Sequence, residues 1–346
     1  MTNAVIGWDI GGAHLKAALL DETGKALRVW QIASPLWQGL VKLTAAIDEV
    51  HAGLDGNQYL HAVTMTGELA DIFPDRKSGV HQITQVMSKR FENLQIYAGP
   101  AGFVSLDNIP AHYAHIASAN WFASAAFIAT QVKSGLFVDL GSTTCDLIPL
   151  YDGQVQNRGY SDAERMQYEE LVYTGVVRTP LMALGDHVSS AGKQYPLAAE
   201  HFATTADVYR LTGELEERHD LAATADGAGK TLLESARRLA RMLCRDVTDA
   251  PIRHWTDLAF GFRQLQLEKL KHAARNQYSY HAEHLNGPII GAGAGSFLLK
   301  VLAQQLGRDH RDAATFISAA TTELSRSAAV CFPAYAVARL AQGDIA

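Results

Sequence analysis

The sequence predicts an α/β protein with two lobes, and three observations lead to this prediction. A pattern of strand, glycine break and strand occurs twice, and segments with helical periodicity follow each occurrence. The chain has 346 residues, more than one domain of about 100 to 200 residues usually holds. Hydrophobic residues make up 48% of the chain and charged residues 19%, so it can fill a core and does not have the composition of a disordered protein.

The two strand–glycine–strand patterns are similar in length and composition. The first comprises the apolar runs Val5–Ile10 and Leu15–Leu20, and the second comprises Leu136–Leu140 and Cys145–Leu150. Short runs of turn residues follow both copies. We interpret the pair as a weak internal repeat, which predicts that each lobe begins with a β-hairpin.

Periodicity predicts most of the remaining elements. Helices are predicted at Pro35–Val50, Ser118–Val132, Thr231–Val247, Trp255–Tyr280 and Arg326–Gln342, the last with a kink at Pro333. A short strand is predicted at Ala62–Thr66, and a strand, glycine loop and helix start at Gly287–Ser296. The first lobe is predicted to span residues 1–130, completed by the C-terminal helix at 326–346, and the second to span 131–325 with a helical insertion. Because no low-complexity linker separates them, we expect the lobes to share a cleft.

The charge of the chain argues against strongly anionic partners. Lys and Arg number 30 and Asp and Glu number 36, so the formal net charge is -6. No basic excess indicates nucleic acid or an anionic membrane as a partner. Arg237, Arg238 and Arg241 are predicted to form a solvated helix face, and since no aromatic residues alternate with them they do not indicate a nucleic-acid site.

Cysteine usage and the absence of a targeting segment predict a cytoplasmic protein. Cys145, Cys244 and Cys331 are an odd number without close spacing, which predicts neither a disulfide framework nor a paired-Cys zinc site. Met1–Asn3 carries no basic residue, and no export signal follows. The uncharged segment Ala114–Val132 contains several polar residues and therefore predicts a buried helix rather than a membrane span.

The glycine breaks carry the residues best suited to bind phosphate. Each follows an aspartate, Asp9 or Asp139, whose carboxylate can bind Mg²⁺ while the unobstructed loop amides bind phosphate oxygens. A third cluster, Gly291–Ser296, lacks the Gly-x-Gly-x-x-Gly spacing, which disfavours a nicotinamide enzyme. A simple turn without a ligand is the alternative for any one loop. Together the clusters predict a nucleotide or diphosphate site formed by Gly11, Gly12, Ala13, His14, Lys16, Gly141, Ser142, Thr143, Thr144, Gly291, Gly293, Gly295 and Ser296.

Four segments carry a resemblance to known proteins: Gly7–Ala13, Met65–Leu69, Val138–Thr144 and Thr204–Gly213. The chain resembles the actin, sugar kinase and heat-shock ATPase superfamily, and within it the hydantoinase A/oxoprolinase branch. Thr204–Gly213 points further, to one-carbon-pathway proteins that include an archaeal methanofuran biosynthesis enzyme. The resemblance implies a two-lobed actin-like ATPase fold, related to ribonuclease H, with a central cleft. His14 occupies a position where the resemblance leads us to expect a small or polar residue such as Asn or Thr, and its effect on the first loop is left open.

The resemblance also implies a transferase of methanofuran-type cofactor biosynthesis, in tetrahydromethanopterin-linked one-carbon metabolism. An aminomethylfuran diphosphate would lose pyrophosphate, and the phenol oxygen of a tyramine-type acceptor would take its place. A furan-stabilised carbocation makes the C–O cleavage feasible, and Mg²⁺ near Asp9 and Asp139 would neutralise the leaving diphosphate. The exact phenolic acceptor and any use of ATP are left open.

Attack by a phenol, whose pKa is about 10 in water, would be helped by a general base. The candidates are Glu68, Asp146 and Asp207, and the sequence does not rank them. The candidates for substrate binding are Thr66, Gly67, Thr205, Arg210 and Arg178. Structural roles are the alternatives. Thr66, Gly67 and Glu68 would end a strand and cap a helix, and Thr205, Asp207 and Arg210 would form an N-cap and a surface ion pair. Asp146 would pair within its hairpin, and Arg178 would form a structural ion pair.

Two other functions are compatible with the same loops. One is an ATP-dependent small-molecule kinase or a hydantoinase/oxoprolinase-type hydrolase. The other is a non-enzymatic, nucleotide-responsive interaction protein, although no appended partner-binding domain is evident. The number of subunits is left open, and a homo-oligomer is one of the assemblies considered.

Overall fold

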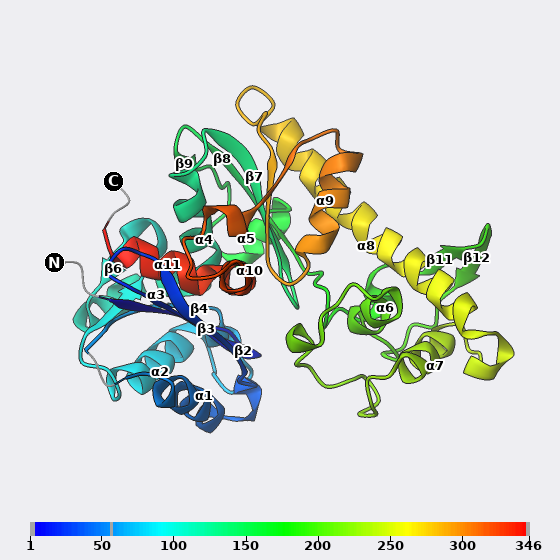
Figure 1. The fold of residues 1–346 in the computed structure, drawn as a ribbon, viewed down its shortest axis with the longest axis horizontal. Helices are drawn as coiled ribbons and strands as arrows, with labels where there is room; N and C mark the ends of the chain where they lie inside the picture. Colours follow the sequence, from blue (N-terminus) through cyan, green and yellow to red (C-terminus); the bar gives the residue numbers. More distant parts are fainter. Residues whose placement is uncertain (1–3, 56–57, 344–346) are drawn as a thin grey trace. The chain divides into compact units, whose positions relative to one another are not determined.

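The computed structural model describes residues 4–55 and 58–343 (Figure 1). It divides into two compact units, the first within Met1–Gly135, Ile148–Gln167 and Asp312–Ala346 and the second within Leu136–Leu147 and Tyr168–Arg311. Residues 1–3 and 344–346, which the predicted first lobe includes, lie outside the described residues. Each unit has its own cluster of buried hydrophobic side chains.

The first unit is built on a six-stranded sheet in the order β3-β2-β1-β4-β5-β6. Its strands are β1 (Val5–Ile10), β2 (His14–Leu20), β3 (Ala26–Ala33), β4 (Leu60–Met65), β5 (Leu94–Tyr97) and β6 (Phe103–Val104). β1 is antiparallel to β2 and parallel to β4, and all six of its residues are buried. A continuous apolar run is what a strand covered on both faces requires.

Helices cover both faces of this sheet. The first unit contains α1 (Leu40–Ala52), α2 (Arg76–Ser88), α3 (Ile109–Ile116), α4 (Asn120–Ala129), α5 (Asp162–Gln167), α10 (Thr322–Val330) and α11 (Phe332–Ala341), together with the short strand β9 (Gln154–Val155). α11 packs against β1, β2 and β4 and against α4, while α1 and α2 lie on the opposite side of the sheet in Figure 1. The approach of α11 is close, because a Cβ atom at Gly7 of β1 would lie 1.9 Å from the carbonyl oxygen of Ala334.

The C-terminal region differs from its prediction. A single kinked helix over Arg326–Gln342 is wrong, because the chain forms α10 and α11, with Cys331 between them outside helical geometry. Pro333 lies in the first turn of α11. Proline has no N–H to donate to the preceding turn, so it begins a new helix instead of continuing α10.

The second sheet has the order β10-β8-β7-β13-β14, with β9 paired to β8. Its strands are β7 (Ser134–Leu140), β8 (Cys145–Tyr151), β10 (Leu171–Val172), β13 (Ile289–Ala292) and β14 (His310–Asp312). β13 runs parallel to β7, which places Ala292 beside Asp139. A separate hairpin is formed by β11 (His187–Ser190) and β12 (Lys193–Pro196).

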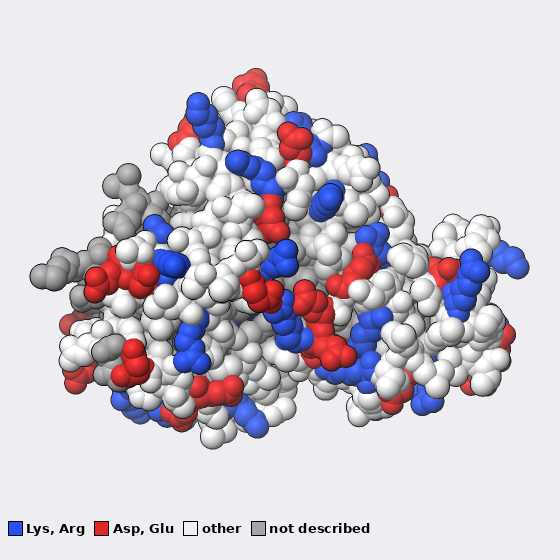
Figure 2. Space-filling model, in the orientation of Figure 1, with Lys and Arg blue, Asp and Glu red and all other residues white. Residues whose placement is uncertain are grey.

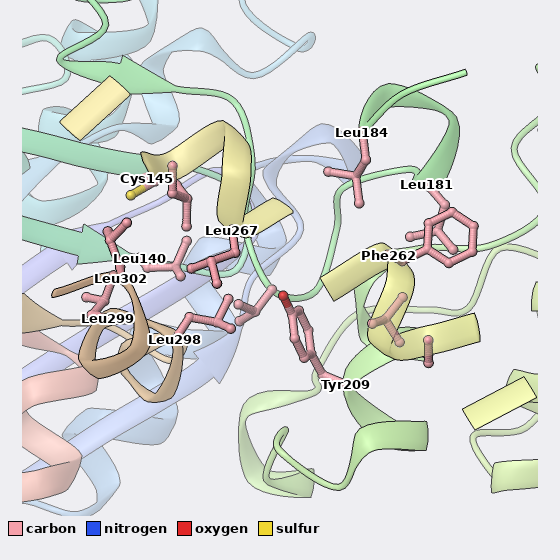
Figure 3. Packing of buried hydrophobic residues seen from close by; sticks show 14 of the residues in the cluster. Leu140, Cys145, Leu181, Leu184, Tyr209, Phe262, Leu267, Leu298, Leu299 and Leu302 are labelled. Atoms are coloured by element: carbon pink, nitrogen blue, oxygen red, sulfur yellow. The ribbon is translucent and has the colours of Figure 1, made fainter. Parts of the chain in front are cut away.

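The helices of the second unit are α6 (Thr205–Thr212), α7 (Leu232–Met242), α8 (Ile252–Tyr280) and α9 (Ser296–Gln305). α6 packs against α7 and α8. Figure 3 shows Leu140 and Cys145, which flank the second glycine loop, in one hydrophobic cluster with Leu298 of α9 and Tyr209 of α6. The second loop is therefore anchored at both ends in the core of its unit.

The prediction that Arg238 belongs to a solvated helix face is wrong. Its side chain is fully buried in α7, whereas Arg237 and Arg241 are exposed. Burial of the guanidinium is possible because Asp207 pairs with it at 2.8 Å. On the face of the molecule that Figure 2 shows, Lys and Arg side chains are interspersed with Asp and Glu. No helix in the described ranges combines the length and apolar character that crossing a membrane requires.

Candidate active-site regions

The first glycine loop joins β1 to β2 as a tight hairpin. The Gly11 amide donates to the His14 carbonyl oxygen at 3.0 Å, and strand pairing places Asp9 opposite Lys16. Asp9 is only 3% exposed, and its carboxylate lies 3.8 Å from the Lys16 ammonium nitrogen. It also accepts a hydrogen bond from the Asn120 side-chain amide at 3.2 Å. A cation and an amide thus offset the loss of water around this buried carboxylate.

Thr66 and Gly67 lie against the first loop, because β4 is parallel to β1 and ends beside it. The Thr66 amide donates to the Ile10 carbonyl oxygen at 2.9 Å. A Cβ atom at Gly67 would lie 3.1 Å from that oxygen and 3.2 Å from the carbonyl carbon of Gly11. Within the first unit, the structure therefore brings together five predicted site residues, Asp9, Gly11, Lys16, Thr66 and Gly67.

The other residues predicted for the first loop serve partly as backbone acceptors. The Gly12 and Ala13 carbonyl oxygens each accept a hydrogen bond at 2.9 Å, from the amides of Leu36 and Ser34. His14 begins β2 and is 7% exposed. These contacts hold the loop to the segment between β3 and α1, so its shape is set by the backbone.

Glu68 lies in a one-turn 3-10 helix, Gly67–Leu69, and its side chain is fully buried. One carboxyl oxygen accepts a hydrogen bond from the Ser118 hydroxyl at 2.8 Å. The other, Oε2, has no hydrogen-bond partner in the part of the chain that the structure describes. Burial raises the pKa of Glu68 to about 7, although the Ser118 hydrogen bond opposes this shift.

Ser118 connects Glu68 to a second carboxyl group. Its hydroxyl lies 3.1 Å from Asp162 Oδ2, and the same oxygen pairs with Arg76 at 2.8 Å. A serine hydroxyl has one hydrogen, so it can donate to only one of the two carboxyl groups. With Glu68 protonated, Glu68 donates to Ser118 and Ser118 donates to the ion-paired Asp162, which satisfies the whole chain.

The second glycine loop joins β7 to β8 with the same backbone pattern as the first. The Gly141 amide donates to the Thr144 carbonyl oxygen at 2.9 Å. Asp139, the last residue but one of β7, is half-buried. Gly293 approaches it closely, since a Cβ atom there would lie 2.4 Å from Asp139 Oδ1. Gly293 also has φ +85, and both facts favour glycine at this position.

A segment that follows β10 packs against the second loop. The amides of Val176 and Val177 donate to the carbonyl oxygens of Gly141 and Ser142 at 3.0 and 3.1 Å. The Arg178 amide donates to the Ser142 carbonyl oxygen at 2.9 Å, and the Arg178 side chain is exposed. The structure therefore places the predicted substrate residue Arg178 beside the predicted phosphate loop.

The remaining glycines of the third cluster support packing. A Cβ atom at Gly291 would lie 2.8 Å from His310 Nε2 and 3.0 Å from Leu299 Cδ1. The Gly295 amide donates to the Leu140 carbonyl oxygen at 2.8 Å, and Ser296 begins α9. Gly293 and Gly295 therefore contact the end of β7, while Gly291 allows the strand to pack closely against α9.

Cys145, directly after the second loop, has the environment of a structural group. Cys145 is fully buried, and burial raises the pKa of its thiol well above the usual value. The prediction that it is a core residue is confirmed. Asp146 is half-buried and stands opposite Leu171 where β8 pairs with β10.

Asp207 and Arg210 make the contacts of a helix cap and an ion pair. One Asp207 oxygen accepts from the Thr204 amide at 3.1 Å, and the other accepts from Arg210 at 2.7 Å and Arg238 at 2.8 Å. Arg210 also donates to Asp220 at 2.6 Å. Asp207 is fully buried, so this ion pair is internal and not at the surface. These contacts match the structural alternative for both residues.

The oxygen donors of the second loop fit a magnesium ion. Among the described residues, no group of three or more His, Cys, Asp or Glu side chains could hold a metal by itself. Mg²⁺, however, is usually held by one or two carboxylates together with water and substrate phosphate oxygens. Asp139 is half-buried and could supply such a carboxylate, while its Oδ1 packs against the backbone of Gly293.

The sequence profile of the Hydantoinase/oxoprolinase family matches residues 60–337, which include Glu68, the second glycine loop and the third glycine cluster. The chain belongs to the hydantoinase/oxoprolinase family. The family predicted from the sequence motifs is thereby confirmed.

This hydantoinase/oxoprolinase-family chain is similar to two curated archaeal proteins named (4-{4-[2-(gamma-L-glutamylamino)ethyl]phenoxymethyl}furan-2-yl)methanamine synthase. The Methanocaldococcus jannaschii protein is 31% identical over 348 residues, covering 99% of this chain and 98% of the relative. The Methanococcus vannielii protein is 26% identical over 188 residues, covering 54% of this chain and 82% of the relative.

Among solved structures, this chain is similar to the nucleotide-free structure of acetone carboxylase, an enzyme of ATP-dependent acetone carboxylation. The TM-score is 0.58 with 10% sequence identity, covering 97% of this chain and 70% of that one. At this identity the likeness establishes the fold alone. The actin-like α/β fold expected for this hydantoinase/oxoprolinase-family chain is confirmed.

Several residues that contact the candidate regions of this family member were not predicted as site residues. They are Ser118 and Asn120 in the first unit and Gly175 and Gln266 in the second. Ser118 and Asn120 were detectable as polar residues in an otherwise apolar segment. Gly175 and Gln266 had no such signal, because their role depends on contacts between residues distant in sequence.

Proposed function

We propose that this chain is a synthase of methanofuran-type cofactor biosynthesis. It would couple an aminomethylfuran diphosphate to a tyramine-type phenol and release pyrophosphate. The observation that carries the proposal is the 31% identity, over 99% of the chain, to a protein named as the corresponding methanamine synthase. The site geometry supports it, because the second loop follows the half-buried Asp139 and accepts a hydrogen bond from the backbone amide of Arg178, whose side chain is exposed.

In this proposal the second loop binds the diphosphate. The amides of Ser142, Thr143 and Thr144 and the guanidinium of Arg178 would donate to the phosphate oxygens, an arrangement suited to anions. Asp139, and Asp9 at the first loop, would provide carboxylates for Mg²⁺. When bound, the ion would neutralise charge that develops on the leaving diphosphate. The protein has a net charge of -6, so attraction of the substrate depends on these local groups.

Glu68 is the proposed general base. As the furfuryl C–O bond to phosphate breaks, its electron pair leaves with the diphosphate, and the phenol oxygen forms the new C–O bond. The phenol proton would be accepted by ionised Glu68 at Oε2, the oxygen for which the described residues provide no hydrogen bond, and this requires that the fully buried side chain becomes accessible when the substrate binds. A base whose pKa is about 7 is matched to neutral pH. Asp207 is a weaker candidate, because both its oxygens already accept hydrogen bonds.

The reaction can be tested with purified protein, the furan diphosphate, Mg²⁺ and either tyramine or γ-glutamyltyramine. We expect one pyrophosphate released for each aryl ether formed, with both products identified by mass spectrometry and phosphate assay. A parallel reaction with ATP serves as the second arm. Release of ADP with no ether from either phenol would contradict the proposal and favour an ATP-dependent kinase or hydrolase.

A further inference from the structure

Gly175 forms the contact between the second loop and the interior of its unit. A Cβ atom at this position would lie 2.3 Å from the Ser142 carbonyl carbon and 2.3 Å from the Thr143 nitrogen. Gly175 therefore lies directly against the peptide bond between Ser142 and Thr143, one of the proposed phosphate-binding amides. Any displacement of Gly175 would move this amide or leave it unsupported.

Side chains hold Gly175 through both of its backbone groups. Its carbonyl oxygen accepts hydrogen bonds from Thr205 Oγ1 at 2.8 Å, Gln266 Nε2 at 2.9 Å and Thr179 Oγ1 at 3.2 Å. Its amide is within hydrogen-bond distance, 2.8 Å, of the Thr179 hydroxyl. A carbonyl oxygen has two lone pairs, and here three donors surround it. The oxygen has no unused acceptor capacity, and the donors hold this peptide in place.

Gln266 is the deepest of these donors. It lies on α8 and is fully buried, and its amide nitrogen also lies 2.9 Å from the Thr174 hydroxyl. Its amide oxygen accepts a hydrogen bond from Tyr209, a residue of α6. An amide buried among apolar side chains is favourable only when its hydrogen bonds are made. A leucine would fill the same volume without this requirement, so packing alone does not account for glutamine here.

We propose that Gln266 and Thr205 are positioning residues, which hold the second loop in its phosphate-binding shape through Gly175. The inference rests on the proposed function, and it assigns a role to Thr205 other than substrate contact. Neither side chain needs to touch the diphosphate. Their effect passes through Gly175 to the Ser142–Thr143 peptide, where an error of about 1 Å in the donor position can lower turnover about 100-fold.

Gln277 provides a matched control on the same helix. It is also fully buried, and its amide donates to a backbone carbonyl oxygen, that of Tyr168, at 2.7 Å. Gln266→Leu and Gln277→Leu thus each remove a buried amide that donates to a backbone carbonyl oxygen, and of these two donors it is Gln266 that bonds to Gly175. The amide oxygens differ, since that of Gln266 accepts from Tyr209 and that of Gln277 has no hydrogen-bond partner among the described residues. The variants are to be compared by thermal unfolding and by calorimetric binding of pyrophosphate with Mg²⁺.

We expect Gln266→Leu to weaken pyrophosphate binding by about 10- to 100-fold, with Gln277→Leu within about twofold of wild type at a comparable loss of Tm. Thr205→Val should weaken binding in the same direction, and Thr205→Ser, which keeps the hydroxyl, should restore it. Equal binding by Gln266→Leu and wild type would overturn the inference. So would an equal loss of binding in Gln277→Leu.

Hydrogen–deuterium exchange separates this inference from the proposed function. In the unliganded protein, Gln266→Leu should speed exchange of a peptide that covers residues 139–146, and Gln277→Leu should not. If wild type binds no pyrophosphate but this difference in exchange appears, the positioning role stands and the proposed ligand is wrong. If the exchange rates of that peptide are unchanged in Gln266→Leu, the positioning role is wrong whatever the ligand.

Discussion

The two aspartate–glycine loops have the same backbone pattern but different surroundings. Asp9 is almost fully buried, with Lys16 and Asn120 at its carboxylate. Asp139 is half-buried and lies against the bare backbone of Gly293. In the first region Lys16 lies beside the buried carboxylate, whereas in the second the carboxylate is less buried and the exposed Arg178 is tied by its backbone amide to Ser142 of the same loop.

This difference indicates that the two aspartate–glycine loops have different roles. Asp9 is almost fully buried and Asp139 only half-buried, so an ion from solution reaches the Asp139 carboxylate more readily. We therefore expect Asp139 to contribute more to cation and diphosphate binding than Asp9 does. The first region contributes Glu68, which follows the Thr66–Gly67 segment beside the first loop.

The largest effect is expected from removing the charge at Asp139. Asp139→Asn should lower kcat/KM by about 1,000-fold and Asp9→Asn by about 100-fold, because leaving-group charge is left less neutralised. Pyrophosphate release at several Mg²⁺ concentrations measures both, and circular dichroism checks folding. A larger Mg²⁺ requirement is expected for Asp139→Asn alone. Turnover near wild type in both variants would contradict the proposed metal site and the proposed difference between the two aspartates.

Loss of the base is expected to have the next largest effect on turnover. Glu68→Gln should lower kcat by about 100-fold, since an amide cannot accept the phenol proton. In wild type, kcat should fall as pH drops below about 7, the pKa of Glu68, because the base becomes protonated. A pH–rate profile from pH 5 to 9 measures this limb. A profile in Glu68→Gln that keeps the same acidic limb would assign it to another group.

The raised pKa of Glu68 also predicts how stability changes with pH. Its ordinary value is 4.5 and its folded value is about 7, so between these values the folded protein binds more protons than the unfolded chain. The free energy of unfolding should therefore decrease as pH rises through this range, by an amount on the order of 2 to 3 kcal/mol for this group. Urea unfolding of wild type and Glu68→Gln at pH 5 and 8 tests it, and the variant should lack this decrease.

Substitutions of Arg178 test whether the second loop binds the diphosphate substrate. Arg178→Ala should raise KM for the diphosphate substrate about 10-fold with a smaller change in kcat, because one charge-assisted donor is lost. Arg178→Lys should lie between alanine and wild type, since lysine keeps the charge but not the forked geometry. Steady-state kinetics measure the split. An unchanged KM in Arg178→Ala would place this side chain outside the diphosphate site.

The smallest effect on turnover is expected at Asp207, despite its place in the segment Thr204–Gly213. Asp207→Asn should lower the free energy of unfolding by about 1 to 3 kcal/mol, because the buried Arg238 loses one charged partner and keeps its ion pair with Asp226. Turnover per folded molecule should stay within about twofold of wild type. Urea unfolding and active-site-normalised kinetics separate the two effects. A loss of turnover with unchanged stability would return Asp207 to the catalytic candidates.

The sequence was sufficient to predict the elements that depend on local pattern. The β1–β2 hairpin and the Asp139 loop follow from apolar runs and glycine breaks, and they lie where these patterns indicate. The burial of Arg238 was not predictable, because helical periodicity cannot identify a partner 31 positions away. The link between Gln266 and Gly175 is similar, since it joins residues 91 positions apart. Contacts between polar groups that are distant in sequence are therefore the part of the structure that local sequence patterns do not predict.

The central claim, that the Asp139 region binds the diphosphate leaving group, is tested most directly by calorimetry with pyrophosphate. Wild type is expected to bind pyrophosphate at one site per chain, only with Mg²⁺ present, and Asp139→Asn should lose this binding while Glu68→Gln keeps it. Binding that is unchanged in Asp139→Asn, or that needs no Mg²⁺, would contradict the account.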